Sequence, residues 1–129
     1  MVAKDIMTRD VITASPSLSV KELAMLMIKN QISGLPVADE SGKIVGLVSE
    51  ADIIGKKGKQ VQAIMSREVF SVTEDASIEQ IAQLMTTHRI KRVPVMNDGR
   101  LVGIVSRADI VNTIAMGDNL ALHTPVYDL

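Results

Sequence analysis

The sequence predicts a mixed α/β (α+β) fold of two tandem β-α-β-β-α repeats, packed through their sheets about a pseudo-twofold axis. Three observations support this prediction: a duplicated sequence, an alternation of β-rich and helical segments within each copy, and a duplicated Gly-x-x-Ser-x-x-Asp pattern. A single copy would expose one apolar sheet face, which the other copy can cover. We therefore expect one module over residues 1–129, with repeat one at 1–58 and repeat two at 59–129.

The duplication is visible in matched segments along the chain. Two segments recur 58 residues later: 5–11 as 63–69, and 32–37 as 90–95. Further along the offset falls to 57, because the turn before Lys43 is one residue longer than the turn before Arg100. An insertion confined to a turn, with its flanks preserved, is typical of a true duplication.

Each copy begins with a short β-rich segment and a helix. The β-rich segments are 11–13 and 69–72. Ser19 and Ser77 begin the helices, and each is followed three residues later by Glu or Gln, which predicts a capping box. Apolar residues at helical spacing are expected to face the core: Val20, Leu23, Ala24, Met25, Met27 and Ile28 in the first copy, and Ile78, Ile81, Ala82 and Met85 in the second.

A hairpin and a second helix complete each copy. The expected hairpin turns are 39–42 and 97–99, and the expected second strands are 44–48 and 101–105. Pro36 and Pro94 lie in the first strand of each hairpin, which indicates the first residues of a strand or a sheet edge. The closing helices begin at Ser49 and Ser106.

Composition excludes several classes of function. The net charge of −1 and the aromatic content of 2% argue against nucleic-acid binding. The chain has no cysteine and no apolar run long enough to span a membrane, so we expect a cytoplasmic protein. His88, at a helix end, and His123 have no ligand partner at metal-binding spacing. Without a nucleophile–base pair, a metal set or a cofactor loop, we expect no enzyme activity, no metal and no cofactor.

The duplicated Ser-x-x-Asp pattern has two interpretations. Ser49 with Asp52, and Ser106 with Asp109, fall on the first turn of a helix, where free amides can hold a phosphate or a sugar hydroxyl. The same spacing forms a capping box that serves only the helix itself. The basic linker at 55–59 also has two interpretations, because its lysines can contact a phosphate or can simply be solvated.

Taken together, these motifs resemble a pair of cystathionine-β-synthase (CBS) domains, also called a Bateman module. The resemblance rests on the Gly-apolar-apolar-Ser-x-x-Asp segments, the apolar-Pro-Val strands and two Ile-Met starts, and it covers about residues 3–115. It implies two clefts between the halves and an adenosine compound as the regulatory ligand. It also implies a homodimer that regulates an enzyme, channel or transporter.

The resemblance implies a set of ligand-binding residues by motif position: Asp52, Ser49, Lys91, Arg92, Asp109, Ser106, Thr13 and Ser71. The two aspartates would accept hydrogen bonds from ribose hydroxyls, for which a carboxylate offers several acceptor positions. The serines of the pattern would meet the ribose or a phosphate. Thr13 and Ser71, on the first strand of each copy, would lie near the base.

The two copies differ before the apolar-Pro-Val strand. The second copy has Lys91 and Arg92 where the first has residues 33–34, Ser-Gly. The resemblance implies that these cations face the cleft of the first copy's Ser–Asp pair and hold phosphate there; a solvated strand edge is the alternative. The other cleft would be empty or take a less charged adenosine compound. Ala51 and Ala108 replace a hydroxyl that many phosphate-binding members carry, which implies weak affinity or a different ligand.

We therefore expect a regulatory module that binds AMP, ADP or ATP and transmits occupancy through dimer or partner geometry. The alternatives are a ligand-free structural dimerisation module, or a module that binds S-adenosylmethionine or methylthioadenosine. The expected partners are an adenosine-containing small molecule, a second copy of the chain and an unidentified regulated protein, but neither nucleic acid nor membrane. The tail after Met116 is expected to be a loose or partner-packed terminus.

Overall fold

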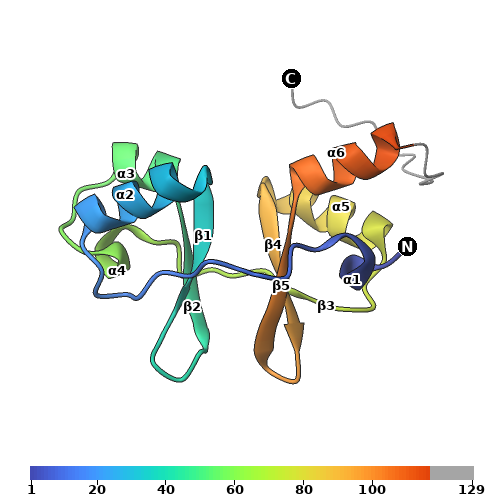
Figure 1. The fold of residues 1–129 in the computed structure, drawn as a ribbon, viewed down its shortest axis with the longest axis horizontal. Coiled ribbons are helices and arrows are strands. Elements are labelled where there is room, and N and C mark those ends of the chain that lie inside the picture. Colours follow the sequence, from blue (N-terminus) through green and yellow to red (C-terminus); the bar gives the residue numbers. More distant parts are fainter. Residues whose placement is uncertain (117–129) are drawn as a thin grey trace. The chain divides into compact units, whose positions relative to one another are not determined.

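The computed structural model describes residues 1–116, and these form two compact units (Figure 1). Unit 2 comprises Val11–Val69, and unit 1 comprises Met1–Asp10 together with the described residues from Phe70 onward. The opening segment of each sequence repeat, 1–10 or 59–69, therefore belongs to the unit formed mainly by the other repeat. The tail predicted after Met116, with His123, lies outside the described residues.

Unit 2 contains α2 (Val20–Asn30), β1 (Gly34–Ala38), β2 (Ile44–Ser49), α3 (Glu50–Gly55) and α4 (Val61–Ile64). β1 and β2 form an antiparallel two-stranded sheet. Ala14 makes an isolated parallel bridge to Val37, in which the Ala14 amide donates to the Pro36 carbonyl at 3.0 Å. In Figure 1 the hairpin turn lies at one end of this unit, and α2 and α3 lie at the other.

Unit 1 contains α1 (Ala3–Ile6), β3 (Val72–Thr73), α5 (Ile78–His88), β4 (Arg92–Asn97), β5 (Arg100–Ser106) and α6 (Arg107–Ala115). Its sheet has the order β3-β4-β5, with β3 parallel and β5 antiparallel to β4. The dark-blue α1 contacts β5 and α6, although it comes from the other end of the sequence (Figure 1). The predicted mixed α/β class and both hairpins are confirmed; the short helices α1 and α4 were not predicted.

The opening strands are shorter than the sequence predicted. Residues 11–13 form no strand, and segment 69–72 contributes only Val72 to β3. The prolines explain where pairing starts, because proline has no amide to donate along that edge. Pairing with β3 begins at Val95, directly after Pro94, and the Ala14 bridge falls at the residue after Pro36. Pro94 is the third residue of β4, which is the central strand of its sheet, so the predicted sheet edge is wrong for this strand.

Helix caps and turns follow the local sequence closely. Ser19 Oγ accepts from the Glu22 amide at 3.0 Å and Ser77 Oγ accepts from the Gln80 amide at 3.1 Å, so both predicted capping boxes are confirmed. The turn between β4 and β5 places positive φ angles at Asp98 (51°) and Gly99 (77°). Two successive positive φ angles are typical of a tight hairpin turn.

The hydrophobic core of each unit consists of aliphatic residues and methionines. The buried residues of unit 2 are Ala14, Leu23, Met27, Leu35, Val37, Val48, Val61, Ile64 and Met65. Those of unit 1 are Ala3, Met7, Ile78, Ile81, Met85, Val93, Val95, Val105 and Ile110.

The predicted core face of α2 is wrong at two positions. Leu23 and Met27 are buried as predicted, but Met25 is 62% exposed and Ile28 is 78% exposed. In a helix of 3.6 residues per turn, the residues two and five positions after Leu23 lie well away from its face. Apolar character alone therefore assigned these two side chains to the wrong side of the helix.

Two glycines allow the opening segments to dock against the hairpins. A Cβ atom at Gly46 would lie 2.8 Å from the Ser66 carbonyl oxygen and 2.7 Å from Met65 Sδ. At Gly103 it would overlap Met7 Sδ and lie 2.7 Å from Met7 Cγ. These glycines start the duplicated pattern, so the same requirement for close approach recurs in both units.

Candidate functional site

The Ser106–Asp109 pair lies where β5 passes directly into α6. The Ser106 amide donates to Asp109 Oδ2 at 2.8 Å, and the Asp109 amide donates to Ser106 Oγ at 3.1 Å. Both residues are half-buried. The pair therefore closes a capping box, as the structural interpretation of the motif predicted.

The Ser49–Asp52 pair occupies the equivalent place between β2 and α3, and it has an additional cation. Asp52 Oδ2 accepts from the Ser49 amide at 2.9 Å and from Ser49 Oγ at 3.2 Å. Lys56 Nζ lies 2.8 Å from Asp52 Oδ1 and also donates to the Ile64 carbonyl at 3.1 Å. Lys56 of the basic linker is thus part of an ion pair.

Capping leaves acceptor positions on both carboxylates. A carboxylate offers about four lone-pair positions, and the capping bonds use only Oδ2 of each aspartate. The capping bonds of Asp109 do not involve its Oδ1. A capping role and a binding role are therefore compatible in both copies.

Lys91 and Arg92 lie beside the Ser–Asp pair of their own unit along the backbone. Arg92 is the ladder partner of Ser106, and the Arg107 amide donates to the Lys91 carbonyl at 2.9 Å. The predicted combination of these cations with Asp52 would span the two units, so it stays a prediction.

Thr13 comes directly before Ala14, which bridges Val37, and Ser71 comes directly before Val72, the first residue of β3. Both are exposed, and neither lies within a strand, so their predicted placement on a strand is wrong. The cause is that pairing of each segment with its hairpin begins only at the residue after Pro36 or Pro94. Their role near a base stays a prediction.

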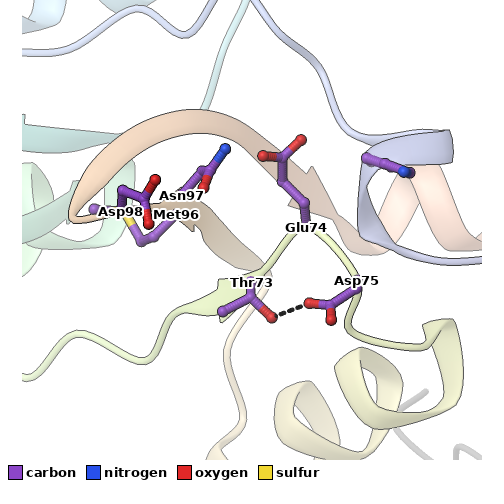
Figure 2. Close-up of a pocket in the computed structure, with 7 residues that line it drawn as sticks. Thr73, Glu74, Asp75, Met96, Asn97 and Asp98 are labelled. Atoms are coloured by element: carbon purple, nitrogen blue, oxygen red, sulfur yellow. Dashed lines mark hydrogen bonds between the residues drawn. The ribbon is translucent and has the colours of Figure 1, made fainter.

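A hollow of about 360 Å³ lies in unit 1 near the turn that joins β4 to β5 (Figure 2). Arg92 is at the other end of β4. Its lining residues are Lys4, Thr73, Glu74, Asp75, Met96, Asn97 and Asp98. None of the predicted ligand-binding residues lines it. The signal in the sequence was the run of Glu and Asp after β3, which sequence reasoning did not connect with the distant turn.

Asp75 in this hollow forms a short hydrogen bond. Thr73 Oγ1 donates to Asp75 Oδ1 at 2.6 Å (Figure 2), and this bond lowers the pKa of Asp75 below 3.8, with a smaller attraction from Lys4. A folded-state pKa below the unfolded value stabilises the fold above the unfolded pKa, and this contribution disappears as pH falls through the folded pKa.

We expect Thr73→Val to reduce the free energy of unfolding slightly near neutral pH, because it removes the donor to the ionised Asp75. The difference from the unchanged chain should be constant well above the unfolded pKa of Asp75 and should disappear as pH falls through its lower folded pKa. Urea denaturation at several pH values measures it, with Thr73→Ser as the control that keeps the donor. A difference that does not depend on pH would show that the Thr73 bond does not control the ionisation of Asp75.

His88 ends α5, as predicted, and it makes a ring contact that sequence reasoning missed. The Phe70 and His88 rings stack with centroids 3.8 Å apart and planes 20° apart. Within residues 1–116, no cluster of three or more His, Cys, Asp or Glu side chains is arranged to hold a metal ion. The described helices are all too short or too polar to cross a bilayer.

Two similar α/β units, each with an antiparallel hairpin followed by a capped helix, define this protein as a tandem repeat of one small domain. The family model of the CBS domain matches residues 3–58 and again residues 61–116. The chain therefore belongs to the CBS domain family and carries two copies of the domain.

Curated relatives place this pair in several contexts. The CBS domain-containing protein YhcV of Bacillus subtilis is 36% identical over 114 residues, which cover 83% of this chain and 81% of YhcV. L-aspartate semialdehyde sulfurtransferase of Methanocaldococcus jannaschii is 38% identical over 113 residues, 84% of this chain but 22% of the enzyme. Inosine-5′-monophosphate dehydrogenase of the same organism is 38% identical over 112 residues and is covered to 23%. The chain thus spans less than a quarter of these two enzymes.

Similar solved structures include complexes with adenosine compounds. The CBS domain pair of protein MJ0100, solved with 5′-methylthioadenosine and S-adenosyl-L-methionine, has a TM-score of 0.85 and 36% identity, covering 90% of this chain and 97% of that chain. CBSX2 in complex with AMP has a TM-score of 0.83 and 28% identity, covering 89% and 96%. Hypoxic Response Protein I, solved with two coordinated zinc ions, has a TM-score of 0.77 and 28% identity, covering 87% and 98%.

Proposed function

We propose that this CBS pair is a regulatory module, without enzyme activity of its own, that binds an adenosine-containing ligand. The observation that supports it most is the duplicated carboxylate at a strand-to-helix junction, which keeps acceptor capacity after capping its helix. Similar pairs were solved with AMP, and with methylthioadenosine and S-adenosylmethionine. AMP, ADP or ATP is our first choice of ligand, and the sulfur-containing adenosine compounds are the second.

In this proposal the two aspartates hold the sugar. The two neighbouring hydroxyls of a ribose are both donors, and an ionised carboxylate accepts both without a competing donor of its own. The capping bond of Asp109 uses Oδ2 and not Oδ1, whereas both oxygens of Asp52 already have protein donors. Ser49 and Ser106 border the ribose or phosphate, and Thr13 and Ser71 border the base.

Lys91 and Arg92 would supply the positive charge for phosphate. Arg92 can contact two phosphate oxygens at once through its planar guanidinium. In this proposal Lys91 and Arg92 bind the phosphate of the ligand at the Asp52 site. Ligand binding then changes the geometry of a homodimer or of a regulated partner protein.

A ligand-free dimerisation module is the second candidate. Capping alone explains the bonds of Ser106 and Asp109. Large apolar side chains are also exposed on helices of both units and could be covered by a second copy: Met25, Ile28, Ile54, Val111 and Ile114. A purely structural module would bury such side chains in its dimer interface and would bind no adenosine compound.

Thermal melting with a ligand panel separates the two candidates. A ligand that binds only the folded chain stabilises it by about 2.7 kcal/mol at a hundredfold excess over its dissociation constant. For a chain of this size, that is a rise of several degrees in Tm. We expect such a rise with at least one of AMP, ADP, ATP, S-adenosylmethionine and methylthioadenosine, and no rise with ribose-free adenine. An unchanged Tm across the whole panel favours the structural module.

A further inference from the structure

The two aspartates of the duplicated pattern differ in charge environment. In unit 2, Lys56 Nζ lies 2.8 Å from Asp52 Oδ1, and the Asp52 side chain is only 15% exposed. In unit 1, Thr113 holds the matching position, and its buried hydroxyl donates to the Asp109 carbonyl at 2.8 Å. Unit 1 therefore has an uncharged side chain at the position from which Lys56 pairs with Asp52.

Lys56 is held in place by a second bond. Its ammonium donates to the Ile64 carbonyl at 3.1 Å, at the last residue of α4. The two acceptors hold the lysine against the carboxylate, although its side chain is 48% exposed. Lys56 therefore links Asp52 in α3 to the end of α4.

We propose that Lys56 sets the charge selectivity of the Asp52 site, an inference that rests on the proposed function. A phosphate bound to the ribose would be repelled by an uncompensated carboxylate and tolerated by a neutralised one. The Asp52 site therefore accepts an anionic adenosine nucleotide. At the Asp109 site, Thr113 stands in place of this lysine and supplies no such neutralisation.

Lys56 acts through Asp52, so it is a positioning residue for the ligand. Neutral adenosine gains nothing from the cation and competes with it for the same carboxylate oxygen. AMP gains from the loss of repulsion. The ratio of the affinities for AMP and adenosine therefore reports the role of Lys56, whereas a change in general stability would move both affinities together.

The test uses the full chain carrying Asp109→Asn, which weakens the second site and leaves one site to titrate. We expect Lys56→Met to lower the ratio of AMP affinity to adenosine affinity by about threefold to tenfold, as suits a partly exposed charge. Lys57→Met is the matched control, because it removes the same charge one residue further along and outside the pair. Lys56→Arg should restore the ratio, and the effect should shrink at high salt.

The outcomes separate this inference from the proposed function. If AMP binds but Lys56→Met and Lys57→Met give the same ratio, the charge selectivity of Lys56 is refuted and nucleotide binding stands. If neither AMP nor adenosine binds any of these chains or the unchanged chain, the proposed function fails and the inference fails with it. A ratio that falls only in Lys56→Met supports both.

Discussion

Gly46→Ala is expected to lower the free energy of unfolding by about 1–3 kcal/mol, the range typical of an overpacked core. The new Cβ would lie 2.8 Å from the Ser66 carbonyl oxygen, a backbone atom that cannot rotate away. That backbone is fixed by two hydrogen bonds with Leu47, of 2.9 and 2.8 Å. Met65 beside it is buried, so it also has little room to move.

Urea denaturation measures this loss, and Gly55→Ala is the matched control. No atom lies within 4 Å of a Cβ at Gly55, which ends α3. The control should be neutral or slightly stabilising, since alanine suits a helix better than glycine. Because residues 65–66 come from the second sequence repeat and Gly46 from the first, equal stability of the two variants would contradict the exchanged docking of the opening segments.

Asp109→Asn is expected to weaken binding of the adenosine ligand about tenfold to a hundredfold. A hydrogen bond to a charged group contributes about 1.5–3 kcal/mol, and each 1.4 kcal/mol is a factor of ten in affinity. The amide keeps an oxygen that can accept from the Ser106 amide, so the helix cap survives. Asp52→Asn should weaken the other site in the same way.

Asp5→Asn is the matched control for this experiment. Asp5 also caps its helix, since the Val2 amide donates to Asp5 Oδ2 at 2.8 Å, but it belongs to no proposed site. If the motif aspartates only cap, all three variants should show a similar small loss of stability and no change in ligand affinity. Calorimetric titration and thermal melting of the same samples distinguish the two roles.

Features coded by neighbouring residues could be predicted from the sequence. Ser19 and Ser77 begin helices because the capping partner is only three residues away, and the hairpin turns depend on glycine and aspartate within the turn itself. The same local logic predicted the helix starts at Ser49 and Ser106. The structure confirms a capping box at Ser106. At Ser49 the Asp52 carboxylate accepts from the Ser49 amide, and Ser49 Oγ donates to that carboxylate as well.

Features that join distant segments could not be predicted in this way. The exchange of opening segments depends on the fit of Met7 against Gly103 and of Met65 against Gly46, and no periodic pattern carries that information. The hollow near Asp75 likewise combines a turn after β3 with the tip of a later hairpin.

The Lys56–Asp52 ion pair could have been predicted from the sequence. The two residues are four apart, a spacing that brings side chains together on a helix. The sequence around Lys56 was interpreted instead as a basic linker, because glycines flank its lysines. Family resemblance pointed to Asp52 as a site residue but gave no reason to compare the charges around the two aspartates.

The most direct test of the account is a calorimetric titration of the unchanged chain with AMP, repeated with S-adenosylmethionine and methylthioadenosine. We predict saturable binding of at least one of them, with no more than two ligands per chain, and its loss in the double variant Asp52→Asn with Asp109→Asn. Saturable binding that survives unchanged in the double variant would contradict the account, and so would the absence of binding by every compound in the series.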